Sequence, residues 1–266
     1  MSDIAKAKSE ALPATRQPKM FLFGDSHSNA IQRAVEKRRG KDQPVPLSAH
    51  RLLKLKNGKE LGDTTLEQFV EIIARLSPDD VVFSVIGGNQ HAVFSTIQHP
   101  QPFDFFTPDG KAPDPAAQAV PYRALEDAFV HGLSTGDGKS IEALRKATPA
   151  RVVHILPPPP KADNSFIEQN HETRFADHGL ANQGVSSPSL RLKFWQLQSR
   201  VLERICADLG VEVMRPPPQT VDADGFLLPD YYAQDATHAN WRYGERLLRV
   251  IEGRYLASRP HAEERA

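Results

Sequence analysis

The sequence contains a single cysteine, Cys206, among its 266 residues, and it has no long hydrophobic run near its start. One cysteine excludes an internal disulfide and any metal site built from several thiolates, so we interpret Cys206 as a residue of helix packing. Residues 1–18 are polar and mixed in charge, without a stretch suited to secretion or anchoring. We therefore expect a disordered leader at residues 1–18 and a cytoplasmic protein with no membrane partner.

An excess of charge of either sign is also missing, because 33 Lys and Arg residues balance 33 Asp and Glu residues. No net field therefore favours nucleic acid or an acidic membrane as a partner, and substrate capture must depend on local shape. Ten histidines are present, but none forms a His-x-x-x-His pair or clusters with carboxylates at a recognised ligand spacing. We expect no metal and no cofactor.

What the sequence does have is an alternation of strand and helix patterns, with 39% hydrophobic residues, which is enough for a substantial core. This alternation predicts an α/β fold with a parallel sheet covered by helices on both faces. Five strands are predicted, at residues 19–23, 45–55, 80–86, 151–156 and 211–214. Helices are predicted at residues 29–37, from a cap at Thr64 or Thr65 to Leu76, at 122–131, 140–147 and 190–209, and after His238.

We expect one three-layer α/β/α domain over residues 19–257, followed by a flexible tail at residues 258–266. Two segments interrupt the alternation and are interpreted as insertions, at residues 96–121 and 161–188. The first is rich in proline and carries phenylalanines that either line an acyl or sugar site or only pin the loop, namely Phe103, Phe105 and Phe106.

Ser26 lies where an apolar run ends and a helical pattern begins, in Phe23-Gly24-Asp25-Ser26-His27. A serine hydroxyl becomes a useful nucleophile only when a base takes its proton and donors hold the oxyanion that forms. Asn89 follows a second apolar run, and Asp235 and His238 directly precede the final helix. Because ligands bind beyond the carboxyl ends of parallel strands, Ser26 and Asn89 should share one edge of the sheet. The loop before the last helix can reach that edge.

Together these motifs resemble those of the SGNH, or GDSL-type, hydrolase family. The matching blocks are Gly24-Asp25-Ser26, Gly62 in Leu61-Gly62-Asp63-Thr64-Thr65, Gly87 with Asn89, and Asp235 with His238. Gly58 is a nearby alternative to Gly62 for the glycine of this block. His27 stands where the family name expects leucine, and Gln90 stands where many members carry aspartate. The resemblance implies a flavodoxin-like five-stranded order, in which strand one is flanked by strands two and three.

The resemblance also implies roles for these residues. His238 would take the proton of Ser26, and Asp235 would orient the imidazole. The backbone N–H groups of Ser26 and Gly62 and the side-chain amide of Asn89 would form the oxyanion hole. Two further histidines lie close to this machinery in the sequence, His27 and His91. They could contact the substrate or its leaving group, or they could simply pack and form hydrogen bonds.

Three functions fit these features. The first is a serine esterase acting on a small or carbohydrate-linked ester, with O-deacetylation as the narrower prediction. The second is an O-acetyltransferase that passes the same acyl group to a sugar hydroxyl, which depends on the exclusion of water. The third is a non-catalytic binding protein with the same fold. Each motif alone could be a turn or a helix cap, but the motifs of Ser26, of Asn89 and of Asp235 with His238, occurring in this order, favour catalysis.

Overall fold

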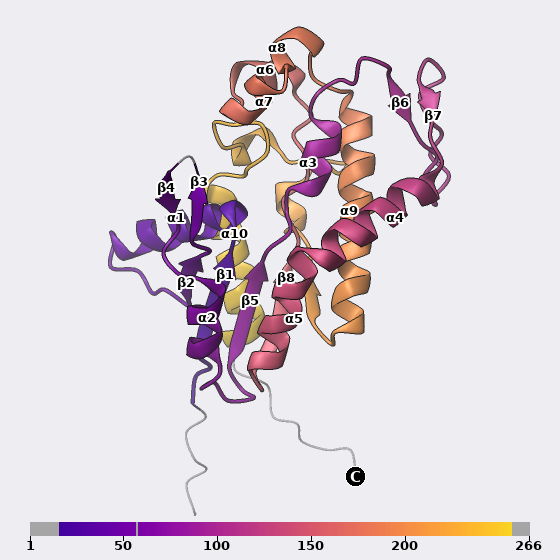
Figure 1. Cartoon of the computed structure of the whole chain (residues 1–266). Helices are drawn as coiled ribbons and strands as arrows, with labels where there is room; N and C mark the ends of the chain where they lie inside the picture. Colours follow the sequence, from indigo (N-terminus) through magenta and orange to yellow (C-terminus); the bar gives the residue numbers. More distant parts are fainter. Residues whose placement is uncertain (1–15, 57, 257–266) are drawn as a thin grey trace, which may run out of the picture.

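The computed structural model describes residues 16–56 and 58–256, so most of the expected leader and all of the expected tail lie outside the described residues. In this part of the chain the main sheet has five parallel strands in the order β2-β1-β5-β8-β9. Their bounds are Met20–Gly24 for β1, Ser48–Arg51 for β2, Val81–Val85 for β5, Arg151–Ile155 for β8 and Glu212–Met214 for β9. The first strand is flanked by the second and third strands of the sheet, which confirms the flavodoxin-like order (Figure 1).

Helices cover both faces of the sheet, as expected for three α/β/α layers (Figure 1). On one face lie α1 (Asn29–Arg39) and α10 (Trp241–Ile251). On the other lie α2 (Leu66–Ile73), α4 (Tyr122–Thr135), α5 (Asp137–Ala147) and α9 (Pro188–Asp208).

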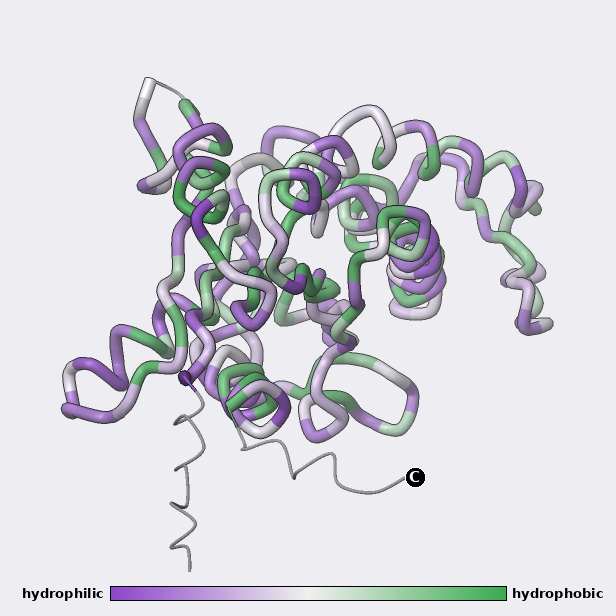
Figure 2. The backbone as a smooth tube through the Cα atoms, turned by 90° about the horizontal axis from the view of Figure 1, so that it is seen from below, coloured by the Kyte–Doolittle hydropathy of each residue, from purple (hydrophilic) through white to green (hydrophobic). Residues whose placement is uncertain are grey.

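The central strand β5 joins the two cores. All five of its residues are buried. Because neighbouring side chains of a strand point to opposite faces, Val81 and Phe83 enter the core beneath α1 and α10, whereas Val82 enters the other core. In Figure 2, viewed from below, apolar segments gather in the middle of the molecule. Cys206 is fully buried in α9, and burial raises the pKa of its thiol to about 12, which agrees with a packing role.

Helix α2 begins with a capping box. The Thr65 side chain accepts a hydrogen bond from the backbone N–H of Gln68, while the Gln68 side chain accepts one from the backbone N–H of Thr65. Of the two threonines that the sequence offered as caps, Thr65 therefore holds this position. At α9, Ser187 is the cap and Pro188 occupies the first helical turn, where its missing N–H costs nothing.

The predicted strand at residues 45–55 is wrong in extent. Strand β2 stops at Arg51, whose partner in the register is Gly24, the last residue of β1. Beyond this point Leu52 pairs with Thr64 in an isolated bridge, and the chain then forms a separate hairpin of β3 (Lys54–Lys56) and β4 (Lys59–Leu61).

The two expected insertions both rise beyond the carboxyl ends of the sheet strands (Figure 1). The first follows α3 (Gln90–Ser95) and contains the short strands β6 (Phe103–Asp104) and β7 (Gln118–Ala119). The second contains α6 (Asn164–Gln169), α7 (Thr173–Asp177) and α8 (Leu180–Gln183). Shorter turns are η1 (Ser26–Ser28), η2 (Pro218–Thr220), η3 (Pro229–Tyr231) and a π turn at Glu252–Leu256.

Two of the three phenylalanines of the first insertion, Phe103 and Phe105, pack on α9 and pin the loop. Phe105 is fully buried with its ring 5.1 Å from that of Phe194 in α9, whereas Phe106 is 60% exposed. A buried ion pair joins Asp104 to Lys193 of the same helix at 2.8 Å. Within residues 16–56 and 58–256, no helix combines the length and the apolar character needed to cross a bilayer.

Candidate active site

Ser26 is held at the carboxyl end of β1 by the local backbone. Asp25 donates its backbone N–H to the carbonyl of Val85 at 2.9 Å, and its side chain accepts from the N–H of His27 at 3.0 Å. Gly24 allows this close approach, since a Cβ at that position would lie 2.6 Å from the Val85 oxygen. Ser26 therefore opens the turn η1 directly beyond the sheet.

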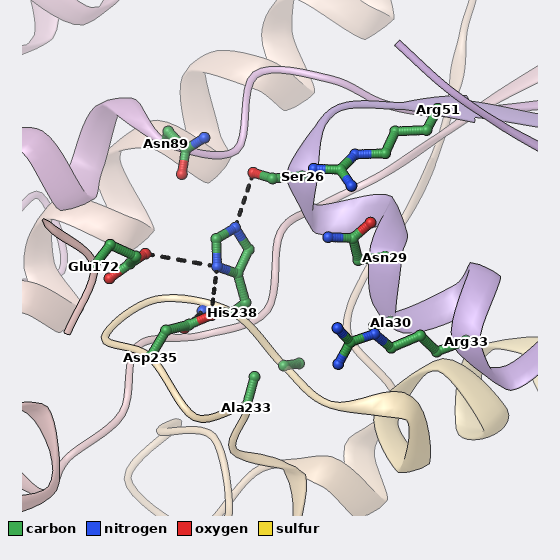
Figure 3. Close-up of a pocket in the computed structure, with 11 residues that line it drawn as sticks. Ser26, Asn29, Ala30, Arg33, Arg51, Asn89, Glu172, Ala233, Asp235 and His238 are labelled. Atoms are coloured by element: carbon green, nitrogen blue, oxygen red, sulfur yellow. Dashed lines mark hydrogen bonds and ion pairs between the residues drawn. The ribbon is translucent and has the colours of Figure 1, made fainter. Parts of the chain in front are cut away.

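The structure brings Ser26 and His238 together although 212 residues separate them. The Oγ of Ser26 lies 2.8 Å from Nε2 of His238, and Nδ1 of His238 lies 2.9 Å from Oδ2 of Asp235 (Figure 3). The other oxygen of Asp235 accepts the backbone N–H of His238 at 2.7 Å, so one carboxylate fixes both the ring and the loop that carries it. Burial raises the pKa of Asp235, but its contacts with His238 and Lys161 outweigh burial and hold it below the ordinary value.

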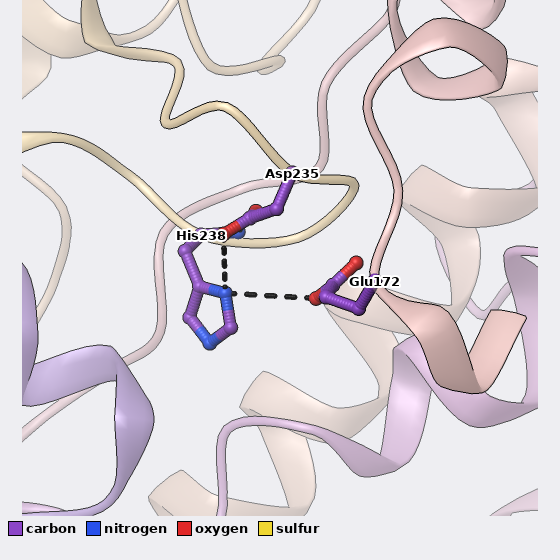
Figure 4. Close-up of side chains that lie close together, drawn as sticks. All are labelled: Glu172, Asp235 and His238. Carbon is purple, nitrogen blue, oxygen red and sulfur yellow. Dashed lines mark hydrogen bonds and ion pairs between the residues drawn. The ribbon is translucent and has the colours of Figure 1, made fainter.

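A second carboxylate, Glu172, lies on the same side of the imidazole (Figure 4). One of its oxygens is 3.6 Å from Nδ1 of His238, and it accepts the hydroxyl of Thr237 at 2.8 Å. Its other oxygen accepts the backbone N–H of Ala236 at 3.1 Å. No sequence pattern pointed to Glu172, because it comes from the second insertion and belongs to no motif.

Glu172, Asp235 and His238 are also the group of described residues whose ligand atoms, all within 4.8 Å of one another, could hold a metal ion. The nitrogen that faces both carboxylates is Nδ1, which donates its proton to Asp235 when Nε2 serves as a base. A cation at this position would displace that proton. Metal binding here would therefore compete with the hydrogen-bonded arrangement of His238.

Lys161 stabilises the loop that carries Asp235 and His238. Its side chain is 1% exposed, and its Nζ donates to the backbone carbonyls of Ala233 and Asp235. The same nitrogen lies 3.7 Å from Oδ1 of Asp235. Burial lowers the pKa of Lys161 to about 8, while the charge of Asp235 opposes this change.

Asn89 lines the cavity as the residue that precedes α3, and His27 holds its side chain. Nε2 of His27 lies 3.2 Å from Oδ1 of Asn89. Burial, followed by the nearby His238, lowers the pKa of His27 to about 4, so at pH 7 the ring is neutral and its Nε2–H donates to Asn89. This bond directs the Asn89 amide nitrogen away from His27, and Figure 3 shows it on the side of Ser26. Gly88 makes room, because a Cβ there would lie 2.2 Å from the His27 ring.

Three other residues singled out in the sequence do not line this cavity. His27 is 6% exposed and faces Asn89, and His91 is 5% exposed with its backbone N–H bonded to Gln198 at 2.6 Å. Gly62 has a φ of 104° and packs so close to Leu52 that a Cβ would lie 2.3 Å from its carbonyl oxygen. The role of Gly62 in an oxyanion hole stays a prediction.

The cavity has a volume of about 260 Å³ and is lined mostly by polar side chains (Figure 3). Four of these, Asn29, Arg33, Arg51 and Glu172, were not predicted as site residues. The full lining is Ser26, Asn29, Ala30, Arg33, Arg51, Asn89, Glu172, Ala233, Asp235, His238 and Ala239.

No protein-family model matches the chain, and no curated protein matches its sequence. Among solved structures, a GDSL-like lipase from Bacteroides thetaiotaomicron VPI-5482 aligns with a TM-score of 0.46 and 12% identity, over 93% of this chain and 92% of that one. Phospholipase A1 from Streptomyces albidoflavus NA297 aligns with a TM-score of 0.47 and 10% identity, over 90% and 99%. An extracellular lipase from Streptomyces rimosus gives 0.46 and 11%, over 89% and 99%.

These alignments extend over nearly the whole of each chain at very low identity. The strand order and the meeting of Ser26, Asp235 and His238 are observed in this chain itself. In motifs and in fold, the chain thus resembles the SGNH, or GDSL-type, hydrolases.

Proposed function

We propose that this protein is a serine ester hydrolase that acts through an acyl-enzyme on Ser26. The observation that carries the proposal is the continuous hydrogen-bonded chain from Ser26 through His238 to Asp235 on the wall of a cavity. In this chain His238 takes the hydroxyl proton as Oγ attacks the acyl carbon, and it returns the proton to the leaving alcohol. Asp235 stabilises the imidazolium that forms between these two steps.

The oxyanion that develops during attack needs donors that are already in place. The backbone N–H of Ser26 at the start of η1 and the amide nitrogen of Asn89 are assigned this role. The hydrogen bond from His27 supports the assignment because it occupies the amide oxygen of Asn89. The backbone N–H of Gly62 is proposed as a third donor.

The cavity favours a short, polar ester. Its volume of about 260 Å³ is below the usual range for drug-sized ligands, and its lining offers few apolar side chains. A small or carbohydrate-linked ester fits these properties, with an O-acetyl group as the narrower proposal. The His238 side chain is 18% exposed, so water reaches the position from which it resolves the acyl-enzyme. This exposure favours hydrolysis over transfer to a sugar hydroxyl.

The direct test is turnover of p-nitrophenyl acetate together with labelling by a fluorophosphonate. We expect both for the native protein, with the label on Ser26, and neither for Ser26→Ala. Ser134→Ala, on the exposed side of α4, is the matched control and should retain both. A native protein that neither turns over the ester nor takes the label would favour a binding protein with this fold.

A further inference from the structure

Two arginines from different elements reach the cavity of Ser26. Arg33 comes from α1, and Arg51 is the last residue of β2. Figure 3 shows both on the wall that also carries Asn29. Arg51 and Asn29 are half-buried and Arg33 is exposed.

The lining of this cavity carries two guanidinium groups, Arg33 and Arg51, and two carboxylates, Asp235 and Glu172. Among the residues that the structure describes, none forms a hydrogen bond or ion pair with the guanidinium of Arg33 or of Arg51. Both carboxylates of the lining are already engaged, Asp235 by His238 and Glu172 by Thr237 and Ala236. The charged groups of the lining that have no hydrogen-bond or ion-pair partner among the described residues are therefore the two guanidinium groups.

We propose that Arg33 and Arg51 bind a carboxylate or similar anionic group on the ester substrate. This inference rests on the proposed function and narrows its substrate class from a small polar ester to an acidic one, such as an acylated acidic sugar. A guanidinium is suited to this role because its planar fork of donors matches the two oxygens of a carboxylate. The Asn29 amide, between the two arginines in Figure 3, supplies a further donor.

The inference can be tested with three esters that share one phenyl ester bond. Phenyl acetate is neutral, 4-acetoxybenzoate has a carboxylate on the alcohol part, and phenyl hydrogen succinate has one on the acyl part. The quantity to measure is the ratio of kcat/KM for each anionic ester to that for phenyl acetate. We expect Arg33→Gln and Arg51→Gln each to lower this ratio about tenfold for at least one anionic ester. The affected ester identifies which part of the substrate is charged.

Arg39→Gln is the matched control, because Arg39 is an exposed arginine of the same helix as Arg33 that does not line the cavity. It should leave the ratio unchanged. Raising the ionic strength should lower the ratio of the native protein, since exposed charge pairs are screened by salt. If the ratio for both anionic esters is the same in the native protein, Arg33→Gln and Arg51→Gln, the inference is wrong, although the esterase function still stands.

A binding measurement gives a result that does not require turnover. Ser26→Ala titrated calorimetrically with 4-acetoxybenzoate and with phenyl hydrogen succinate should bind one of them. Adding Arg33→Gln and Arg51→Gln to that background should weaken binding at least about tenfold. Equal affinity with and without the arginines, or no binding of either ester, would overturn the inference. Failure of the proposed function has a different signature, namely native protein that is not labelled and does not cleave phenyl acetate.

Discussion

At the scale of single residues, two carboxylates face one imidazole nitrogen, and their contacts predict unequal roles. Asp235 accepts the proton of Nδ1 at 2.9 Å, whereas Glu172 is 3.6 Å away and its oxygens hold Thr237 and Ala236. Asp235→Asn should lower kcat on the order of 10³- to 10⁴-fold, because an amide favours the wrong tautomer of His238. Glu172→Gln should cost less than about tenfold, since its amide oxygen still accepts a hydrogen bond. Steady-state kcat values on p-nitrophenyl acetate test both expectations. A loss in kcat below tenfold for Asp235→Asn would show that Asp235 does not orient His238.

The residues that sequence reasoning found and those it missed differ in one physical respect. Ser26, Asn89 and Asp235 each stand at the end of a predictable element, so the strand edge or loop that carries them could be placed in advance. Arg33 is one of four basic residues in α1, and only the rotation of the helix on the sheet decides which of them faces the cavity. Glu172 reaches the site through the fold of an insertion, which no periodic pattern describes.

At the scale of elements, the site depends on how closely α1 packs against α10, because α1 follows Ser26 and α10 follows His238. Gly244 permits this packing, since a Cβ there would lie 2.0 Å from the carbonyl oxygen of Ala30. Gly244→Ala should therefore separate the helices, destabilise the fold by about 1–3 kcal/mol and lower kcat. Urea unfolding and steady-state rates measure the two effects. Gly253→Ala, where an added Cβ would meet nothing within 4 Å, is the control, and equal behaviour of the two variants would contradict this account.

The ends of helices and strands are harder to predict than their types, because an end depends on the elements that pack or pair beside it. The apolar run at β5 predicted a strand buried on both faces, and all of its residues are buried. By contrast, β2 ends where its partner β1 ends, and no residue pattern within residues 45–55 predicts this end. The turn from β2 into a hairpin is a consequence of the sheet and not of the local sequence.

At the scale of the whole molecule, the contact between Ser26 and His238 depends on the folded sheet and its helices, since the two residues are 212 positions apart in the sequence. The loop of His238 is in turn held by Lys161 and Glu172, which belong to the second insertion. These bonds predict that the His238 loop unfolds in the same transition as the rest of the domain, and not at a lower concentration of denaturant.

Urea unfolding followed by three probes tests this expectation. Circular dichroism reports the helices, fluorophosphonate labelling reports the contact of Ser26 with His238, and thiol modification of Cys206 reports opening of the core around α9. Because Cys206 is the only cysteine and is fully buried, its modification requires that core to open. We expect the three midpoints to coincide, as they do when one cooperative transition exposes all sites. Labelling that fails at lower urea than the other two probes would show that the His238 loop opens as a unit of its own, and that Lys161 and Glu172 do not couple it to the core.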